Sequence, residues 1–154
     1  MTPSKGWLIA GCLILGATAA SAEMVGPKEV VYDDFAVTAS LTGKPGDPIE
    51  GRIVFADRKL GNCLACHANE DLADQLFHGE VGPVMDGVGD RWSPEELRGI
   101  VVNSKQVFGP ETVMPAFYRI IEGQRIRKEF VDKTILTAEQ VEDVVAYLST
   151  LKEE

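Results

Sequence analysis

Two cysteines and a histidine form the run Cys63-Leu64-Ala65-Cys66-His67. In such a run each cysteine can form a thioether bond with one vinyl group of a haem, and the histidine that follows can bind the iron. The same residues could instead form a structural disulfide, a thioredoxin-like redox pair or half of a zinc site. Structural zinc takes four protein ligands, and a thioredoxin-like pair lies beside alternating strands and helices, whereas the flanking sequence here is typical of helix. The run therefore predicts one covalently bound haem c, attached at Cys63 and Cys66 with His67 on the iron.

A closed haem site needs a second axial ligand, for which His78, Met85 and Met114 are candidates, with Met24 close to the N-terminus. His78 follows His67 so closely that the chain could hardly pass round the haem, and we expect it to be a surface histidine. Met85 lies in a stretch rich in turn residues, 82–89. A backbone carbonyl there can accept a hydrogen bond from Nδ1 of His67, and we expect the Met85 side chain to pack on the haem.

Met114 lies far enough along the chain to reach the other face of the haem. Pro115 follows it, which stiffens the loop and removes one backbone donor. We therefore predict Met114 as the second axial ligand. A histidine and a methionine together raise the reduction potential and leave no open position on the iron, so the pair favours electron transfer over oxygen activation.

The first 22 residues have the three parts of a secretory signal peptide. Lys5 supplies a basic start, residues 6–20 are almost all apolar, and small residues lead to a cleavage site after Ala22. The apolar run is too short for a membrane span of ~20 residues. A lipoprotein cut before Cys12 is the alternative, but it would leave an apolar region shorter than the ~7 residues a signal needs. We expect export to the periplasm and a mature chain that keeps only the two cysteines of the haem-binding run.

The predicted mature chain is strongly acidic. Of the 15 basic residues only Lys5 precedes position 23, and all 24 acidic residues lie at or after Glu23, so its formal charge is 14 minus 24, or −10. Such an excess disfavours nucleic acid and anionic membranes as partners, and it favours steered encounter with basic surfaces.

An irregular arm followed by a helix opens the mature chain. Residues 23–47 show Gly, Pro and Asp punctuation and no helical period. The apolar residues of this arm lie either on the protein's own core or on a partner. Asp47 and Pro48 then predict an N-cap and a first helical turn, and the helix should run from Ile49 to about Arg58.

Two further helices carry capping boxes at their starts. Ser93 and Glu96 predict the start of a helix that stops near Asn103. Thr137 begins a helix over about 138–152, with its apolar residues at steps of three and four. Residues between 116 and 136 predict a loop with short ordered pieces, and its basic stretch is read as a solvated face. The domains predicted are thus a signal peptide (1–22), an N-terminal arm (23–47) and an all-α domain (48–154).

The order of these motifs resembles that of class I cytochromes c. The residues that carry the resemblance are Cys63, Cys66 and His67, then Gly82-Pro83, then Met114-Pro115, then a terminal amphipathic helix with Tyr147. The resemblance implies a class I cytochrome c fold in which the first and last helices cross beside the haem. Gly51, Phe55 and Tyr147 match the small and aromatic residues at that crossing.

Residues 48–152 also resemble the SoxX family, monohaem subunits of SoxAX thiosulfate-oxidising complexes, in three strings: 87–92, 112–118 and 141–148. The resemblance implies a periplasmic heterodimer with SoxA, which joins thiosulfate oxidatively to a cysteine of the SoxYZ carrier. The sulfur chemistry would lie on SoxA, and this chain would be a non-catalytic relay that passes electrons to a small cytochrome c. The alternatives are a free-standing periplasmic class I cytochrome c, and a haem sensor or peroxidase-like enzyme with an open iron position.

Overall fold

A computed structural model describes residues 24–123 and 125–153 of the chain. The signal peptide and its cleavage after Ala22 lie outside these residues. Four α-helices occur in the described part: α1 (Pro48–Ala56), α2 (Val88–Arg91), α3 (Pro94–Phe108) and α4 (Ala138–Thr150). Three short 3₁₀ turns accompany them: η1 (Cys63–Ala65), η2 (Glu70–Leu72) and η3 (Lys128–Phe130).

The prediction of an all-α fold with an irregular N-terminal arm is confirmed. In the described part of the chain, β pairing is limited to one isolated bridge between Asp33 and Ala36 in the arm. Each of the helices in that part is too short or too polar to cross a lipid bilayer.

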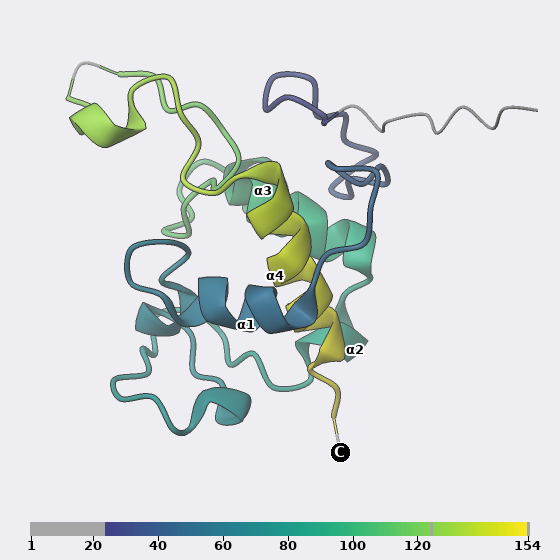
Figure 1. The fold of residues 1–154 in the computed structure, drawn as a ribbon, viewed down its shortest axis with the longest axis vertical. Coiled ribbons are helices and arrows are strands. Elements are labelled where there is room, and N and C mark those ends of the chain that lie inside the picture. The colour runs from purple at the N-terminus through teal and green to yellow at the C-terminus, as the bar shows by residue number, and fades with distance from the viewer. Residues whose placement is uncertain (1–23, 124, 154) are drawn as a thin grey trace, which may run out of the picture.

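Helices α1 and α4 cross near the centre of the molecule, as the resemblance implies (Figure 1). Gly51 makes the close approach possible, because a Cβ atom at this position would lie 1.9 Å from the Asp143 backbone oxygen of α4. Next to it the rings of Phe55 and Tyr147 meet edge to face, with centroids 5.7 Å apart. The crossing therefore combines backbone contact at one point with aromatic packing at the next.

The predicted N-cap of α1 is confirmed, and the helix ends two residues before the predicted Arg58. The Asp47 carboxylate accepts a hydrogen bond from the Ile49 N–H at 2.8 Å. At the other end, Asp57 leaves the helical conformation, and its carboxylate accepts a hydrogen bond from the Lys59 N–H at 2.7 Å. This local side-chain bond competes with a further helical turn, which explains the earlier end.

Both predicted capping boxes are present, at Ser93 with Glu96 and at Thr137 with Gln140. The predicted stop of α3 at Asn103 is wrong, because the helix continues to Phe108. Asn103 is instead a break inside the helix, with φ −152° and ψ 84°. The short helix α2, whose first two residues lie at the end of the turn-rich stretch 82–89, was not foreseen. Its Gly89 N–H donates to the Leu151 carbonyl just beyond α4 at 2.9 Å.

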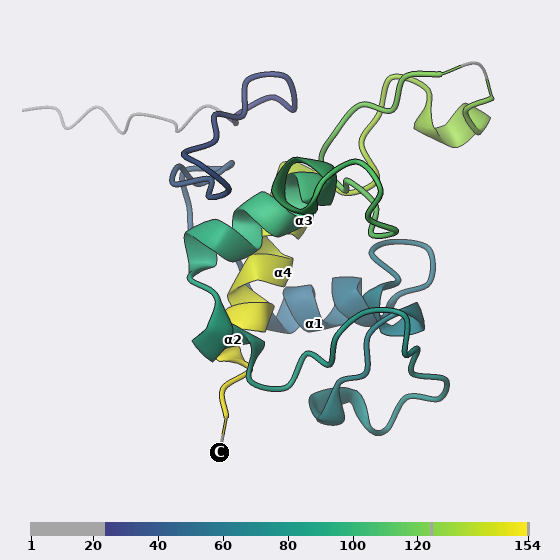
Figure 2. The same ribbon diagram turned by 180° about the vertical axis from the view of Figure 1, so that it is seen from behind.

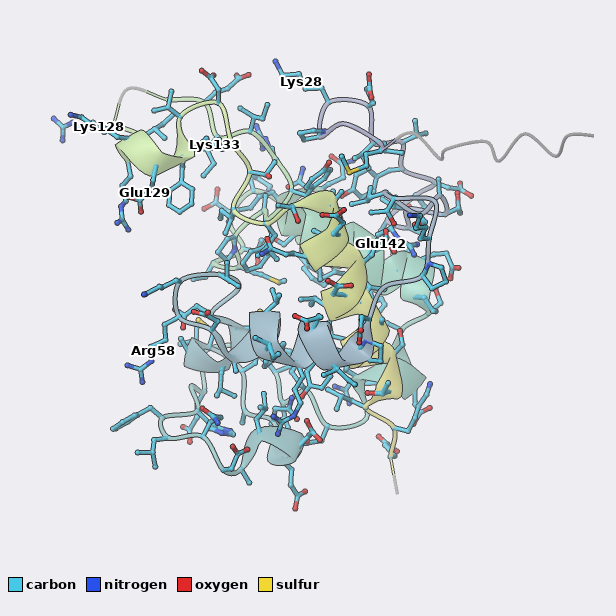
Figure 3. The ribbon with its side chains drawn as sticks, viewed as in Figure 1. Lys28, Arg58, Lys128, Glu129, Lys133 and Glu142 are labelled. Atoms are coloured by element: carbon cyan, nitrogen blue, oxygen red, sulfur yellow. The ribbon has the colours of Figure 1, made fainter. Side chains whose placement is uncertain are left out.

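Part of the arm packs on the protein's own core, whereas Val31 of the arm is 78% exposed. Val37 and Leu41 are almost completely buried. Beneath them Arg98 of α3 and Glu142 of α4 form a buried two-pronged ion pair, with N···O distances of 2.7 and 3.0 Å. Arg98 also donates to the Val37 carbonyl, and Glu142 accepts from the Leu41 N–H. Figure 3 shows Glu142 on α4 beside the arm.

A lobe formed by residues 119–123 and 125–135 projects from the body of the protein in both views (Figures 1 and 2). Its 3₁₀ turn η3 carries Lys128 and Glu129, and Lys133 follows (Figure 3). The described cations of the lobe are exposed, and Arg127 pairs with Glu129 at 2.6 Å. These positions agree with the prediction of a solvated face.

We predict that Arg98→Met destabilises the haem-bound protein by about 3–5 kcal/mol, because it leaves the Glu142 carboxylate buried without a charged partner. The free energy of unfolding, measured by denaturant titration, checks this value. The control is Lys152→Met, which removes a half-exposed pair with Asp90 and should cost less than about 1 kcal/mol. Equal losses in the two variants would contradict the prediction.

Candidate functional site

A tight turn holds the two cysteines and the histidine together. Asn62 adopts a left-handed conformation, with φ 49°, and leads into η1. The N–H groups of Cys66 and His67 both donate to the Cys63 carbonyl, at 3.0 and 2.9 Å. As a result, the side chains of all three predicted haem-binding residues of the run line one cavity.

The orientation of His67 is fixed by the segment that follows Val81. Nδ1 of His67 lies 2.7 Å from the Pro83 carbonyl oxygen, which confirms the expectation of a backbone acceptor in 82–89. The segment is itself tied to the turn, because Gly82 N–H donates to the Cys66 carbonyl at 2.8 Å and Met85 N–H to the Ala68 carbonyl at 2.9 Å. With Nδ1 protonated and bonded in this way, Nε2 is the ring nitrogen left for a metal.

Gly82 lies directly against the imidazole ring. A Cβ atom on Gly82 would lie 2.2 Å from Cε1 of His67 and 2.6 Å from Nδ1. Any side chain here would therefore displace the ring or the segment that carries Pro83.

The cavity has a volume of about 540 Å³ and mostly apolar walls, a size within the range of cofactor sites. Its walls come from all four described helices, with Phe55 contributed by α1, and from the loops between them. Residues from these elements that face it are Met85, Val88, Trp92, Leu97, Val101, Phe117, Leu136, Val144 and Leu148. Met85 is buried in this wall, as expected for a side chain that packs on the haem.

Cys63 adds an uncharged group to this apolar surface. The residue is only half-buried, but its exposed part faces the cavity, and burial raises the pKa of its thiol to about 12. A thiol at this position stays protonated at neutral pH, and a thioether to a haem vinyl group is uncharged as well. The environment thus suits the covalent product.

Met114 reaches the same cavity from the segment between α3 and α4. The other candidate ligands do not line it, apart from Met85. Met24 is largely exposed. His78 is half-buried, not a surface histidine as expected, since its Nδ1 accepts from the Asn69 N–H at 3.3 Å and its Nε2 lies 2.9 Å from the Leu72 carbonyl.

A hydrogen-bond network that runs from the buried Asn69 and Tyr147 to the half-exposed Asp71 and Arg52 was not found by sequence reasoning. Asn69 is 1% exposed and donates to the Tyr147 hydroxyl at 2.8 Å, which in turn donates to Asp71 at 2.7 Å. Arg52 of α1 also bonds Asp71, at 2.8 Å. Burial and the bond to Asp71 raise the pKa of Tyr147, and the same bond, followed by Arg52, lowers the pKa of Asp71. The network fastens the chain after His67 to the crossing of α1 and α4.

Arg91 was missed as well. Its guanidinium donates to the Val84 carbonyl at 2.8 Å and to the Asp86 carbonyl at 2.7 Å, so it clamps the backbone just after Pro83. No sequence signal connects an arginine on one short helix with carbonyl groups five and seven residues earlier.

The residues present fit a haem c. They offer two thiols, one oriented imidazole and the thioethers of Met85 and Met114 around a single apolar cavity. In the described residues no group of three or more His, Cys, Asp or Glu side chains is placed to hold a metal ion. Comparison with known families agrees: the profile described as "Cytochrome c" matches residues 49–152. The chain belongs to the cytochrome c family. Accordingly, it is an electron-transfer protein with covalently bound haem c, and its predicted class I fold is confirmed.

This cytochrome is also similar to a chain in the crystal structure of SoxXA from P. pantotrophus. The two sequences are 49% identical, and the structures superpose with a TM-score of 0.78. The match covers 84% of this cytochrome and 99% of that chain. No curated protein sequence gave a match.

We predict that Gly82→Ala destabilises the haem-bound cytochrome by about 1–3 kcal/mol, because the new methyl group overlaps the His67 ring. The thermal unfolding midpoint and the visible spectrum check this, since a displaced imidazole changes both. The matched control is Gly123→Ala, where an added Cβ meets nothing within 4 Å. If both variants unfold like the wild type, the close packing at Gly82 does not constrain the ring.

Proposed function

We propose that this chain is the monohaem electron-transfer subunit of a SoxAX-type complex. In this proposal Cys63 and Cys66 attach the haem, and His67 and Met114 are the axial ligands of its iron. The observation that carries the site is that both cysteines, the oriented imidazole and the Met114 side chain all line one cavity. The similarity to the P. pantotrophus SoxXA chain supports the kind of complex.

The haem, when bound, supplies an iron that gains and loses one electron without making or breaking substrate bonds. The protein side of this task is to hold both ligands and exclude water. The Pro83 carbonyl keeps the His67 ring in one orientation and one tautomer, which increases its basicity as a ligand. The apolar walls disfavour extra charge in the cavity, and the thioether ligand adds to this effect, so both raise the reduction potential.

The partner proposed is SoxA, in the periplasm. Joining a thiol to thiosulfate forms one sulfur–sulfur bond and releases two electrons and the thiol proton. This chain would take those electrons singly and pass them to a small cytochrome c, while SoxA would act on the SoxYZ carrier. Cys63 and Cys66 are committed to the haem, so after removal of a signal peptide containing Cys12 no cysteine is left for sulfur chemistry. The formal charge of −9 for the whole chain favours encounter with a basic acceptor surface.

We predict that Met114→Ala lowers the reduction potential by on the order of 100 mV or more and lets the ferrous haem bind carbon monoxide, because the thioether ligand is lost. A redox titration and a carbon monoxide difference spectrum measure the two effects. The control is Met85→Leu, which changes another methionine of the cavity wall and should leave the iron closed. An unchanged potential and spectrum in Met114→Ala would move the ligand to Met85 or His78.

The partner is tested by co-expression with the neighbouring genes in a host that attaches haem c. We expect the tagged chain to co-elute with a SoxA-type cytochrome in size-exclusion chromatography, at the mass of a heterodimer. Elution alone, as a haem-loaded monomer, would contradict the subunit proposal and favour the free-standing carrier.

A further inference from the structure

The break in α3 coincides with a hydroxyl group from the N-terminal arm. In an unbroken helix the Asn103 N–H would bond the Gly99 carbonyl, four residues earlier. The Tyr32 hydroxyl donates to that Gly99 carbonyl at 3.0 Å. Burial raises the pKa of Tyr32 to about 12, and the nearby Asn103 backbone acts in the opposite direction. A side chain that bonds a carbonyl of the helical ladder in place of the usual amide is a recognised cause of kinks.

The same break directs α3 toward the segment that carries Met114. The carbonyl groups of Val101 and Val102, directly before Asn103, accept hydrogen bonds from the N–H groups of Phe117 and Tyr118 at 3.2 and 3.1 Å. In a regular helix these carbonyls would face the amides of residues 105 and 106. The break thus lets a helix present backbone acceptors to a neighbouring loop.

Directly after the break, Ser104 bonds the backbone of Met114. The Ser104 side chain is completely buried, and its hydroxyl lies 2.6 Å from the Met114 carbonyl and 3.1 Å from the Pro115 carbonyl. Its single proton is shared between these two acceptors. Lys105 also donates to the Thr112 carbonyl. The backbone on both sides of Met114 is therefore anchored to the part of α3 that follows the break.

We infer that Tyr32 is a positioning residue for the axial methionine: its hydroxyl fixes the break in α3, and the break fixes the Met114 loop through Ser104 and the carbonyls before it. The inference rests on the proposed ligation by Met114. The arm then does more than cover the core. The Tyr32 hydroxyl, more than 80 positions from Met114 in the sequence, determines how firmly the Met114 side chain is held against the iron.

A second arm contact provides the control. The Tyr118 hydroxyl donates to the Val25 carbonyl at 2.8 Å, which ties the arm to the loop without involving the break in α3. Tyr118→Phe and Tyr32→Phe each keep the ring and remove one hydroxyl that bridges the arm to the body. They differ in the acceptor of the lost bond, which is a backbone carbonyl of α3 for Tyr32 and a backbone carbonyl of the arm for Tyr118.

The experiment uses the haem-loaded full chain and two measurements: the charge-transfer absorption of methionine-ligated ferric haem, and the affinity of the ferric protein for imidazole. Tyr32→Phe should weaken that absorption and raise the imidazole affinity about fivefold to tenfold, as expected for the loss of one hydrogen bond. Ser104→Ala should change both in the same direction. Because the two residues act in series, the double variant should change the affinity by less than the product of the single changes. Tyr118→Phe should leave imidazole affinity within about twofold.

Two results would overturn the inference while leaving the ligand proposal intact. Wild-type imidazole affinity in Tyr32→Phe, with a raised affinity in Ser104→Ala, would mean that the break forms without the tyrosine hydroxyl. An equal rise in Tyr118→Phe would mean that the general attachment of the arm matters and the insertion into α3 does not. Absence of the methionine absorption in the wild-type protein is a different result, which would overturn the ligation by Met114 itself.

Discussion

The structure depends on one constraint, which is that an apolar cavity of about 540 Å³ occupies the middle of a small core. Leaving these apolar walls in contact with water would forgo much of the burial that stabilises a small core. The haem of a c-type cytochrome fills such a space with a large apolar surface. All four described helices and the loops between them therefore supply walls, and Cys63 and Cys66 are proposed to secure the group that completes the core.

Two separate supports hold His67 and Met114, the proposed ligands that face this cavity. On the histidine side, the Pro83 carbonyl and the close approach of Gly82 fix the imidazole, and the buried Asn69 ties the following chain to Tyr147. On the methionine side, hydrogen bonds from the Met114 loop run to α3 around Asn103. Each support uses backbone carbonyls that are free to accept a bond from outside a helix: that of Pro83 on one side, and those of Val101 and Val102 on the other. Irregular backbone is therefore concentrated around the proposed ligands.

The N-terminal arm is bonded to both α3 and α4. Arg98 and Glu142 join α3 to α4 below it and bond its backbone at Val37 and Leu41. Such a buried pair adds little net stability over an apolar packing, but it specifies one arrangement of three segments. The Tyr32 hydroxyl of the arm also bonds the Gly99 carbonyl of α3, so the arm is an integral part of the haem-binding domain.

Local signals in the sequence determined the haem attachment run, the starts of α1, α3 and α4, and the choice of Met114 as a candidate ligand. These features depend on residues within a few positions of each other: the Cys-x-x-Cys-His spacing, the capping boxes at Ser93 and Thr137, and Pro115 after a methionine. The tertiary structure alone decided that α3 passes through Asn103 instead of stopping there, that His78 is tied into its own loop, and that Tyr32 and Ser104 lie next to the Met114 support. The physical reason is that these outcomes depend on hydrogen bonds between groups distant in the chain, and a hydroxyl or carbonyl gives no sign in the sequence of which distant partner it will meet.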